Sequence, residues 1–236
     1  MKITEYTVQA GLKQPRTIAL AADLHDRPFD KVIDKMRAVS PDYIMISGDL
    51  TNRKSDKTLY VPAFLTACAR LAPTFYSRGN HEWRYDESDA RRIAETGAVL
   101  LDNAYVHIDE LCVGGLTSGF MGSRFERRYG TLVPKLSWLK SFEAEPGYKI
   151  LLCHHPEYFP LYLRERDIDL VLSGHAHGGQ IRIFNHGLFA PGQGVWPKYT
   201  AGMHEGKLII STGLANTGGI IPRVNNETEL VVIKLI

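Results

Sequence analysis

Short apolar runs and amphipathic segments alternate along the first 95 residues of the chain. The apolar runs are only a few residues long and end in polar clusters, which is typical of strands buried on both faces. The segments between them repeat apolar side chains at helical spacing, as in Val32, Ile33, Met36 and Val39. The expected strands are 1–9, 17–22, 43–46 and 74–76, and the expected helices are 29–39, 58–71 and 88–95. This alternation predicts parallel strands joined by helices.

The pattern changes after residue 98, where three strand-like runs follow one another without a helix between them. These runs are 99–101, 104–108 and 111–113. The later elements are expected to be helices at 135–142 and 157–166 and strands at 148–153, 170–172, 180–184, 207–210 and 229–236. Two runs of consecutive strands within this alternation predict an α/β fold with two packed mixed β-sheets flanked by helices, an αββα sandwich. A chain of 236 residues is long enough for one such core, so we expect a single domain over residues 1–236.

Composition indicates the class and the compartment of the protein but not its substrate. Hydrophobic residues make up 44% and charged residues 23% of the chain, which is ordinary for a globular protein. The formal net charge of +2 does not indicate nucleic acid as a partner. The N-terminal segment lacks a continuous apolar core, and no run is long enough to span a bilayer, so a cytoplasmic location is expected. The three cysteines have neither metal-finger nor redox spacing, and we expect them to be small buried side chains in a reducing compartment.

Five of the expected strands run directly into polar, chemically capable clusters. These clusters are Asp23-Leu24-His25, Gly48-Asp49, Gly79-Asn80-His81, His154-His155-Pro156 and Gly174-His175-Ala176-His177. In open α/β sheets, binding sites gather at the carboxyl ends of the strands, so five such ends can converge on one cleft. Each cluster alone is most often an ordinary turn, but five of them at strand ends favour a functional site.

The residue types of these clusters predict a metal centre. Carboxylates, imidazoles and one amide are ligands suited to Mn, Fe, Zn or similar ions, and no cysteine joins them. Two carboxylates offset only half of the charge of two dications, and the surplus suits an anionic substrate such as a phosphate ester. Two metal ions about 3.5–4 Å apart can activate a water molecule and clamp the phosphoryl oxygens during in-line displacement.

The motifs D-x-H, G-D, G-N-H-E, a lone strand-end histidine and G-H-x-H occur here in the order found in a known superfamily. Together they resemble the calcineurin-like metallophosphoesterases, and the resemblance extends from Asp23 to the closing strand. The segments GHAHGGQ, APGQG and PKYT are similar to its bacterial phosphodiesterase-like branch. That branch includes membrane-associated phosphodiesterases and homologues of a UDP-diacylglucosamine hydrolase.

This resemblance implies a ligand set of seven residues for two divalent metal ions. Asp23, His25 and His177 would hold the first metal, Asn80, His154 and His175 the second, and Asp49 would bridge both. A metal-bridging hydroxide would then attack the phosphorus atom, without a covalent phospho-enzyme.

The resemblance also assigns roles to residues that bind no metal. His81 would be catalytic: it would protonate the leaving oxygen or stabilise the transition state, which suits an imidazole near neutral pH. Many relatives carry an acid three residues after the bridging aspartate, whereas this chain has Asn52 there, so the support around the metals could differ.

Three further residues are candidate substrate contacts. Arg78 lies two residues before Asn80 and could reach a phosphate, although a solvated or salt-bridged arginine is an equal alternative. His155 adjoins a predicted ligand and is interpreted as a supporting or substrate-facing residue. Arg124 lies in the segment 119–128, which mixes apolar side chains with arginines. This segment could recognise the leaving group or lipid headgroups, or it could be a solvated loop.

The leading hypothesis is therefore hydrolysis of a phosphodiester or pyrophosphate bond in a small phosphate-ester substrate. A phosphomonoesterase or protein phosphatase with the same centre is the first alternative, and the low net charge argues weakly against a nuclease. A non-catalytic scaffold on the same fold is the remaining alternative, but it would be expected to lack ligands or the catalytic histidine. Peripheral contact with a membrane or lipid stays open, as does the oligomeric state.

Overall fold

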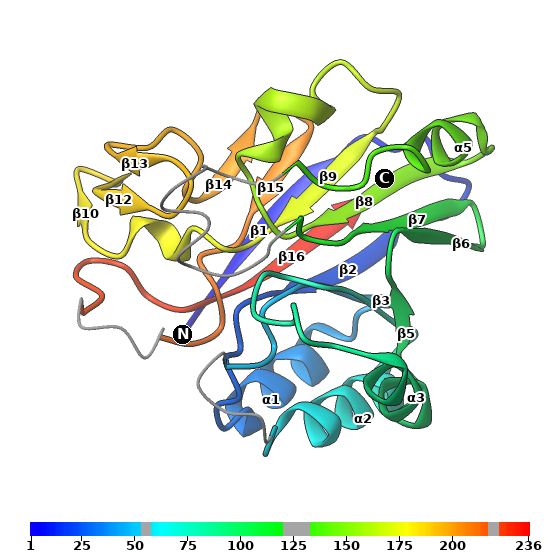
Figure 1. Cartoon of the computed structure of the whole chain (residues 1–236), viewed down its shortest axis with the longest axis horizontal. Coiled ribbons are helices and arrows are strands. Elements are labelled where there is room, and N and C mark those ends of the chain that lie inside the picture. The colour runs from blue at the N-terminus through cyan, green and yellow to red at the C-terminus, as the bar shows by residue number, and fades with distance from the viewer. Residues whose placement is uncertain (53–57, 120–132, 217–221) are drawn as a thin grey trace.

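The computed structural model describes residues 1–52, 58–119, 133–216 and 222–236. Its centre is a pair of six-stranded mixed sheets, which confirms the predicted α/β fold class (Figure 1). The first sheet has the order β1-β16-β2-β3-β4-β5, with bounds Lys2–Val8, Glu229–Leu235, Arg16–Ala21, Tyr43–Ser47, Thr74–Ser77 and Val99–Leu101. The second has the order β14-β15-β9-β8-β7-β6, with bounds Gly202–His204, Leu208–Ile210, Leu170–Ser173, Tyr148–Cys153, Leu111–Leu116 and Ala104–Ile108.

Side-chain alternation along the strands explains how the sheets pack. In β2, Ile18 and Leu20 face the layer between the two sheets, whereas Ala19 and Ala21 face the helices. The inner layer is filled from the second sheet by residues such as Val113, and all of these side chains are buried. Both faces of these strands are covered, which explains why their sequences are continuously apolar.

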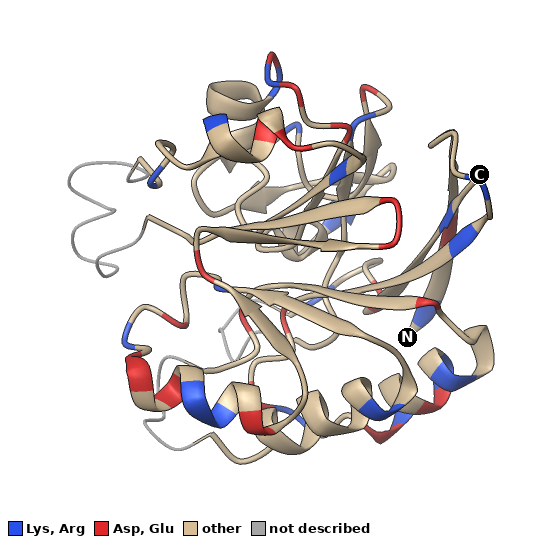
Figure 2. Cartoon of the chain, turned by 90° about the vertical axis from the view of Figure 1, so that its right-hand side faces the viewer, with Lys and Arg blue, Asp and Glu red and all other residues tan. Residues whose placement is uncertain are grey.

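Helices cover the outer face of each sheet (Figure 1). The first sheet packs against α1 (Asp30–Val39), α2 (Val61–Leu71) and α3 (Glu87–Glu95). The second packs against α5 (Leu139–Ala144) and the π-helical turn Phe159–Leu163. Charged side chains lie mainly on the outer helix faces and in loops, while the strands of both sheets carry few of them (Figure 2). No helix in the described part of the chain is long and apolar enough to cross a membrane.

Several predicted elements differ from the structure in length. The helix expected at 157–166 is only the π-helical turn Phe159–Leu163, which contains Pro160. The strand expected at 180–184 is the two-residue β10 (Arg182–Ile183), which pairs with β11 (His186–Gly187). A second hairpin, β12 (Phe189–Ala190) with β13 (Gly194–Val195), was not predicted. The three cysteines are free and buried, as predicted for small core side chains.

Candidate metal centre

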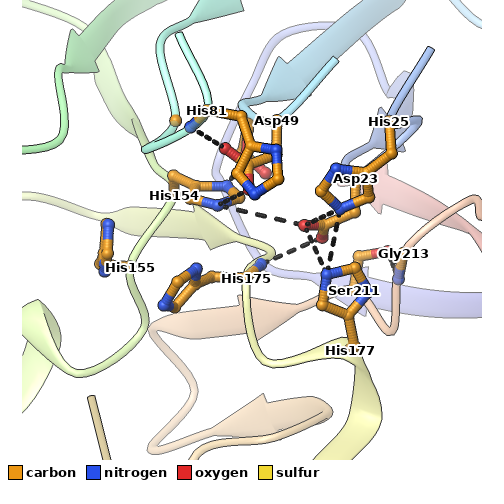
Figure 3. A network of polar contacts seen from close by, with 12 residues as sticks. Asp23, His25, Asp49, His81, His154, His155, His175, His177, Ser211 and Gly213 are labelled. Atoms are coloured by element: carbon orange, nitrogen blue, oxygen red, sulfur yellow. Dashed lines mark hydrogen bonds and ion pairs between the residues drawn. The ribbon is translucent and has the colours of Figure 1, made fainter. Parts of the chain in front are cut away.

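The five polar clusters lie at the carboxyl ends of parallel strands. β2, β3 and β4 are parallel neighbours in the first sheet, and β8 and β9 are parallel neighbours in the second. Each of these strands is followed within a few residues by one of the clusters. Seven of the eight residues predicted for the centre are drawn together in Figure 3, with side chains from both sheets pointing toward one another. The sheet pair therefore builds one site from both of its layers.

The backbone leaves these strands in an unusual conformation. Five predicted ligands have positive φ although none is glycine: Asp23 (57°), His25 (52°), Asp49 (53°), His175 (66°) and His177 (46°). Such left-handed conformations are uncommon for non-glycine residues and gather at functional sites, where the surrounding structure enforces them. These turns follow the strand ends, and the side chains that they carry face one another in Figure 3.

The first group of candidate ligands comprises Asp23, His25 and His177. The Asp23 Oδ1 atom lies 3.6 Å from His25 Nε2 and 3.3 Å from His177 Nε2, and the two Nε2 atoms are 3.2 Å apart. All three residues are buried. One carboxylate oxygen and two imidazole nitrogens thus face a common point, which is the arrangement a divalent metal requires.

The second group comprises Asp49, His154 and His175, whose candidate ligand atoms lie within 4.8 Å of one another. The distance from His154 Nε2 to Asp49 Oδ2 is 3.1 Å, and the distance from the same nitrogen to Asp23 Oδ1 is 4.0 Å. Asp49 also forms a group with His25 and His81. Asp49 therefore lies in two candidate ligand groups, and its role as a bridging ligand stays a prediction.

Unsatisfied oxygens show that these residues fit a metal ion. Among the described residues, none donates a hydrogen bond to Asp23 Oδ1 or Asn80 Oδ1, and both atoms are buried. Leaving a buried acceptor unpaired costs about 1–3 kcal/mol, and bound divalent cations would satisfy both oxygens. Histidine, aspartate and asparagine side chains are suitable ligands for Mn, Fe or Zn. The types of these residues and their geometry therefore indicate divalent-metal binding.

The charges of the centre are strongly coupled. Burial alone would lower the pKa of His154, but the carboxylates of Asp49 and Asp23 raise it to about 10. Burial favours the protonated form of Asp49, yet His154 and His81 hold the pKa of its carboxyl well below the usual range. Burial lowers the pKa of His177 to about 3 despite the nearby Asp23. In the metal-free protein, a proton on His154 therefore balances charge that a metal ion would otherwise balance.

Hydrogen bonds outside the ligand set hold the ligands in place. The Nδ1 atom of His154 donates to Ser47 O at 2.7 Å, which directs Nε2 toward the centre. The backbone N–H of His175 donates to Asp23 Oδ2 at 3.0 Å, and that of His81 donates to Asp49 Oδ1 at 2.8 Å. Each aspartate is thus oriented by a strand-end loop other than its own.

Glu82 is a supporting residue whose role the sequence did not reveal. Its fully buried carboxylate accepts hydrogen bonds from Asp49 N (2.9 Å), Gly79 N (2.7 Å), Thr51 N (2.9 Å) and the Thr51 hydroxyl (3.0 Å). Burial and the neighbouring Asp49 raise its pKa. Its position directly after the G-N-H motif was the only available signal in the sequence. These hydrogen bonds connect the loop after β3 with the loop after β4.

His81 is more open than the predicted ligands. Its side chain is 20% exposed, and its Nε2 lies 3.6 Å from Asp49 Oδ2. The ring stands edge-on to His25, with 4.6 Å between ring centroids. His81 therefore borders the centre from its accessible side.

The three candidate substrate contacts have different outcomes. Arg78 donates to Asp102 at 2.7 Å and to Glu82 O at 2.8 Å, so its contacts support a structural role and give no support to phosphate binding. His155 is buried, with Nδ1 2.9 Å from Glu157 Oε1 and its ring centroid 4.1 Å from that of His175, which places it behind a ligand. Arg124 lies outside the described residues, as does most of the segment 119–128.

Comparison with known proteins identifies relatives over most of the chain. An uncharacterized metallophosphoesterase of Campylobacter jejuni is 32% identical over 232 residues, which cover 92% of this chain and 57% of that protein. One of Helicobacter pylori is 29% identical over 178 residues, which cover 71% and 46%. The chain thus spans about half the length of these two relatives. The phosphodiesterase YaeI of Escherichia coli is 26% identical over 244 residues, which cover 94% of this chain and 83% of that protein.

A solved structure and a family match agree with these relatives. A dimetal phosphatase from Danio rerio shares the fold with a TM-score of 0.52 at 12% identity, covering 85% of this chain and 88% of that one. Residues 16–179 match the family described as calcineurin-like phosphoesterase, and this range contains all of the predicted ligands and His81. The chain belongs to the calcineurin-like phosphoesterase family, in agreement with the resemblance of its motifs.

Proposed function

We propose that the chain hydrolyses a phosphodiester or pyrophosphate bond of a small substrate with the help of two divalent metal ions. The observation that supports this proposal is that Asp49 lies in one candidate ligand group with His154 and His175 and in another with His25 and the partly exposed His81. Asp23, His25 and His177 would hold one ion, and Asn80, His154 and His175 the other. Bound there, the ions would supply an activated water molecule and draw negative charge from the phosphoryl oxygens.

The side chains of the protein supply positioning and proton transfer. The left-handed turns and the Glu82 carboxylate fix the ligands before substrate arrives, so little reorganisation accompanies the reaction. His81 would donate a proton to the leaving oxygen, and this role is supported by the partial exposure of its ring and by its backbone N–H, which donates to Asp49. An alkoxide is a poorer leaving group than p-nitrophenolate, so this proton transfer would matter most for an ester of an alkyl alcohol.

A diester is favoured over a monoester by one relative. The phosphodiesterase YaeI matches 94% of this chain, whereas the two relatives of higher identity are uncharacterized. The same centre could act on a phosphomonoester or a phosphoprotein, and this remains the alternative function.

Activity assays with matched variants test the proposal. Manganese-loaded protein is expected to hydrolyse bis(p-nitrophenyl) phosphate, and EDTA should abolish the reaction. Asp49→Ala should remove activity and metal, whereas His81→Ala should keep the metal and lower kcat by roughly 100-fold or more for a diester with an alkyl leaving group, and by less for the p-nitrophenyl diester. His107→Ala is the matched control, because His107 is an exposed histidine paired with Glu145 on the far edge of the second sheet.

The outcomes separate the alternatives. Faster hydrolysis of p-nitrophenyl phosphate than of the diester would favour the phosphomonoesterase. Folded, metal-loaded wild type that is inactive toward both esters would sink the enzymatic proposal. Elemental analysis that finds no metal and no uptake would favour the scaffold alternative.

A further inference from the structure

A cavity of about 650 Å³ lies outside the candidate metal centre. Its walls come from β1 and β16 of the first sheet, β14 of the second, and residues 182–185 and 223–227. β1 and β14 are the edge strands of their sheets, so the cavity occupies the place where the two sheets meet at one side of the molecule. In Figure 1 the N-terminus and the β10–β13 segment lie on that side.

The cavity wall carries an excess of positive charge. Lys2 is paired with Glu229 at 3.3 Å, so these two charges offset each other. Glu227 is largely exposed and lies 3.6 Å from the N-terminal amine. Arg182 and Arg223 have no carboxylate within 4.0 Å among the described residues. Among these residues the two guanidinium groups interact only with more distant carboxylates, that of Glu229 for both and that of Asp23 for Arg223.

The two arginines are held by backbone carbonyls instead. Arg182 donates to Gly178 O at 2.9 Å and to Asn185 O, and Arg223 donates to Thr212 O at 2.6 Å and to Ala215 O at 2.8 Å. Within the part of the chain that the structure describes, the Nε and Nη1 atoms of Arg223 have no hydrogen-bond partner. Burial lowers the pKa of the Arg182 guanidinium, which reflects the cost of keeping its charge partly dehydrated. An anion in the cavity would offset that cost.

The rest of the wall is polar and uncharged. It includes the side-chain amides of Asn185 and Asn225 and the hydroxyls of Tyr6 and Thr212. Among the described lining residues, Ala201 alone has an aliphatic side chain. Such a lining suits a ligand with several hydroxyl groups better than an apolar one. Guanidinium groups recognise phosphate and carboxylate by paired N–H donors.

We propose that this cavity is a second binding site, which takes a small hydroxylated anion of the sugar-phosphate class recognised by Arg182 and Arg223. The site is separate from the metal centre, but the two share a wall. Arg223 Nη2 lies 3.2 Å from His177 Nδ1, and Asn226 Nδ2 donates to His177 O at 2.7 Å. A ligand that engages Arg223 therefore changes the support of His177, and by linkage metal binding changes the affinity for that ligand.

Calorimetric titration of the full chain tests the site. Glucose 6-phosphate is titrated into protein kept metal-free with EDTA, so that the metal centre cannot capture the phosphate. We expect one molecule of glucose 6-phosphate to bind per chain, whereas glucose should not bind. Arg182→Gln should lower the affinity at least tenfold, and Asn185→Ala serves as a second variant if Arg182→Gln does not fold. Arg91→Gln, on the exposed face of α3, is the matched control and should bind like wild type.

Each other outcome overturns part or all of the proposal. No binding at millimolar concentration, or equal binding to Arg182→Gln, would refute the site. Binding only in the presence of Mn²⁺ would assign the ligand to the metal centre. Inorganic phosphate that binds as tightly as glucose 6-phosphate would refute recognition of the hydroxylated part.

A second titration tests the link to His177. The affinity for Mn²⁺ is measured with and without saturating glucose 6-phosphate, in wild type and in Arg182→Gln. A shift in wild type that is absent in the variant is expected. The same shift in both proteins would place its origin at the metal centre and refute the link.

Discussion

At the scale of single residues, the buried Glu82 carboxylate accepts hydrogen bonds from the loops after β3 and β4, which carry candidate ligands. The types of Asp23, His25 and Asp49 and their places after apolar runs were enough to predict a metal centre. The partners of Glu82 could not be predicted in the same way. They are N–H groups of loops that follow two different strands, and only the pairing of β3 with β4 brings them within reach.

Glu82→Gln is expected to destabilise the protein and weaken metal binding. Each carboxylate oxygen of Glu82 accepts two hydrogen bonds, so an amide nitrogen in place of one oxygen would face two donors. Losing these two bonds in a buried place should lower the free energy of unfolding by about 2–4 kcal/mol. Urea denaturation and Mn²⁺ titration measure the two effects.

The control for this change is Glu95→Gln, which makes the same replacement on an exposed acid of α3. It should leave both quantities within experimental error. Equal stability and equal Mn²⁺ affinity in Glu82→Gln and wild type would show that the four hydrogen bonds do not hold the centre.

At the scale of elements, the strand ends were predictable and the close contacts between loops were not. Apolar runs that end in chemical clusters indicated which ends converge, because parallel strands present their carboxyl ends at one edge. The loops after β3 and β4 can approach closely because Gly79 has no side chain. A Cβ atom at Gly79 would lie 2.3 Å from Asp49 Oδ1 and 2.5 Å from Asp49 N.

Gly79→Ala is therefore expected to displace Asp49. The added methyl group would meet the Asp49 carboxylate, which is a candidate metal ligand, so Mn²⁺ affinity should fall at least tenfold. Overpacking should also lower the free energy of unfolding by roughly 1–3 kcal/mol. Calorimetric titration with Mn²⁺ is the deciding measurement.

Gly206→Ala separates this steric effect from the general cost of replacing glycine. Gly206 has φ of +65° with nothing within 4 Å of an added Cβ, so the change should lower stability slightly and leave Mn²⁺ affinity unchanged. Undiminished Mn²⁺ affinity in Gly79→Ala would mean that the loops can separate without moving Asp49.

At the scale of the whole molecule, two packed sheets could be predicted but their strand orders could not. The alternation of elements gives β2, β3 and β4 as parallel neighbours, because helices connect them. Nothing local shows that β16 lies between β1 and β2, parallel to one and antiparallel to the other. That placement depends on contacts between residues more than 200 positions apart, such as Lys2 with Glu229. The cavity wall depends on the same distant pairing.

The stability of the metal-free protein should decrease in mildly alkaline solution. The folded-state pKa of His154 is raised to about 10 from an ordinary 6.5 because Asp49 and Asp23 outweigh its burial. A raised histidine pKa contributes stability that is complete below about pH 6.5 and is lost as the pH rises toward 10. The free energy of unfolding of EDTA-treated protein, measured with urea, should fall over this range by an amount on the order of a few kcal/mol, and the urea midpoint should fall with it.

Two comparisons isolate the source of this pH dependence. His154→Gln cannot bind the proton, so its midpoint should vary less with pH. Manganese-loaded wild type should also vary less, because the ion replaces the proton between the carboxylates. A metal-free wild type whose midpoint is constant from pH 6.5 to 9.5 would contradict the prediction.

The place of β16 in the first sheet also constrains how the chain is made. Ribosomes release the N-terminal residues first, at about 5–20 residues per second. β1 cannot find its neighbour until residues 229–235 have left the exit tunnel, because β16 separates it from β2. During translation, the β1 edge and the exposed side of β2 are therefore open to other nascent chains. Slowing translation or withholding chaperones should consequently lower the yield of this protein more than that of one whose first strands pair with each other.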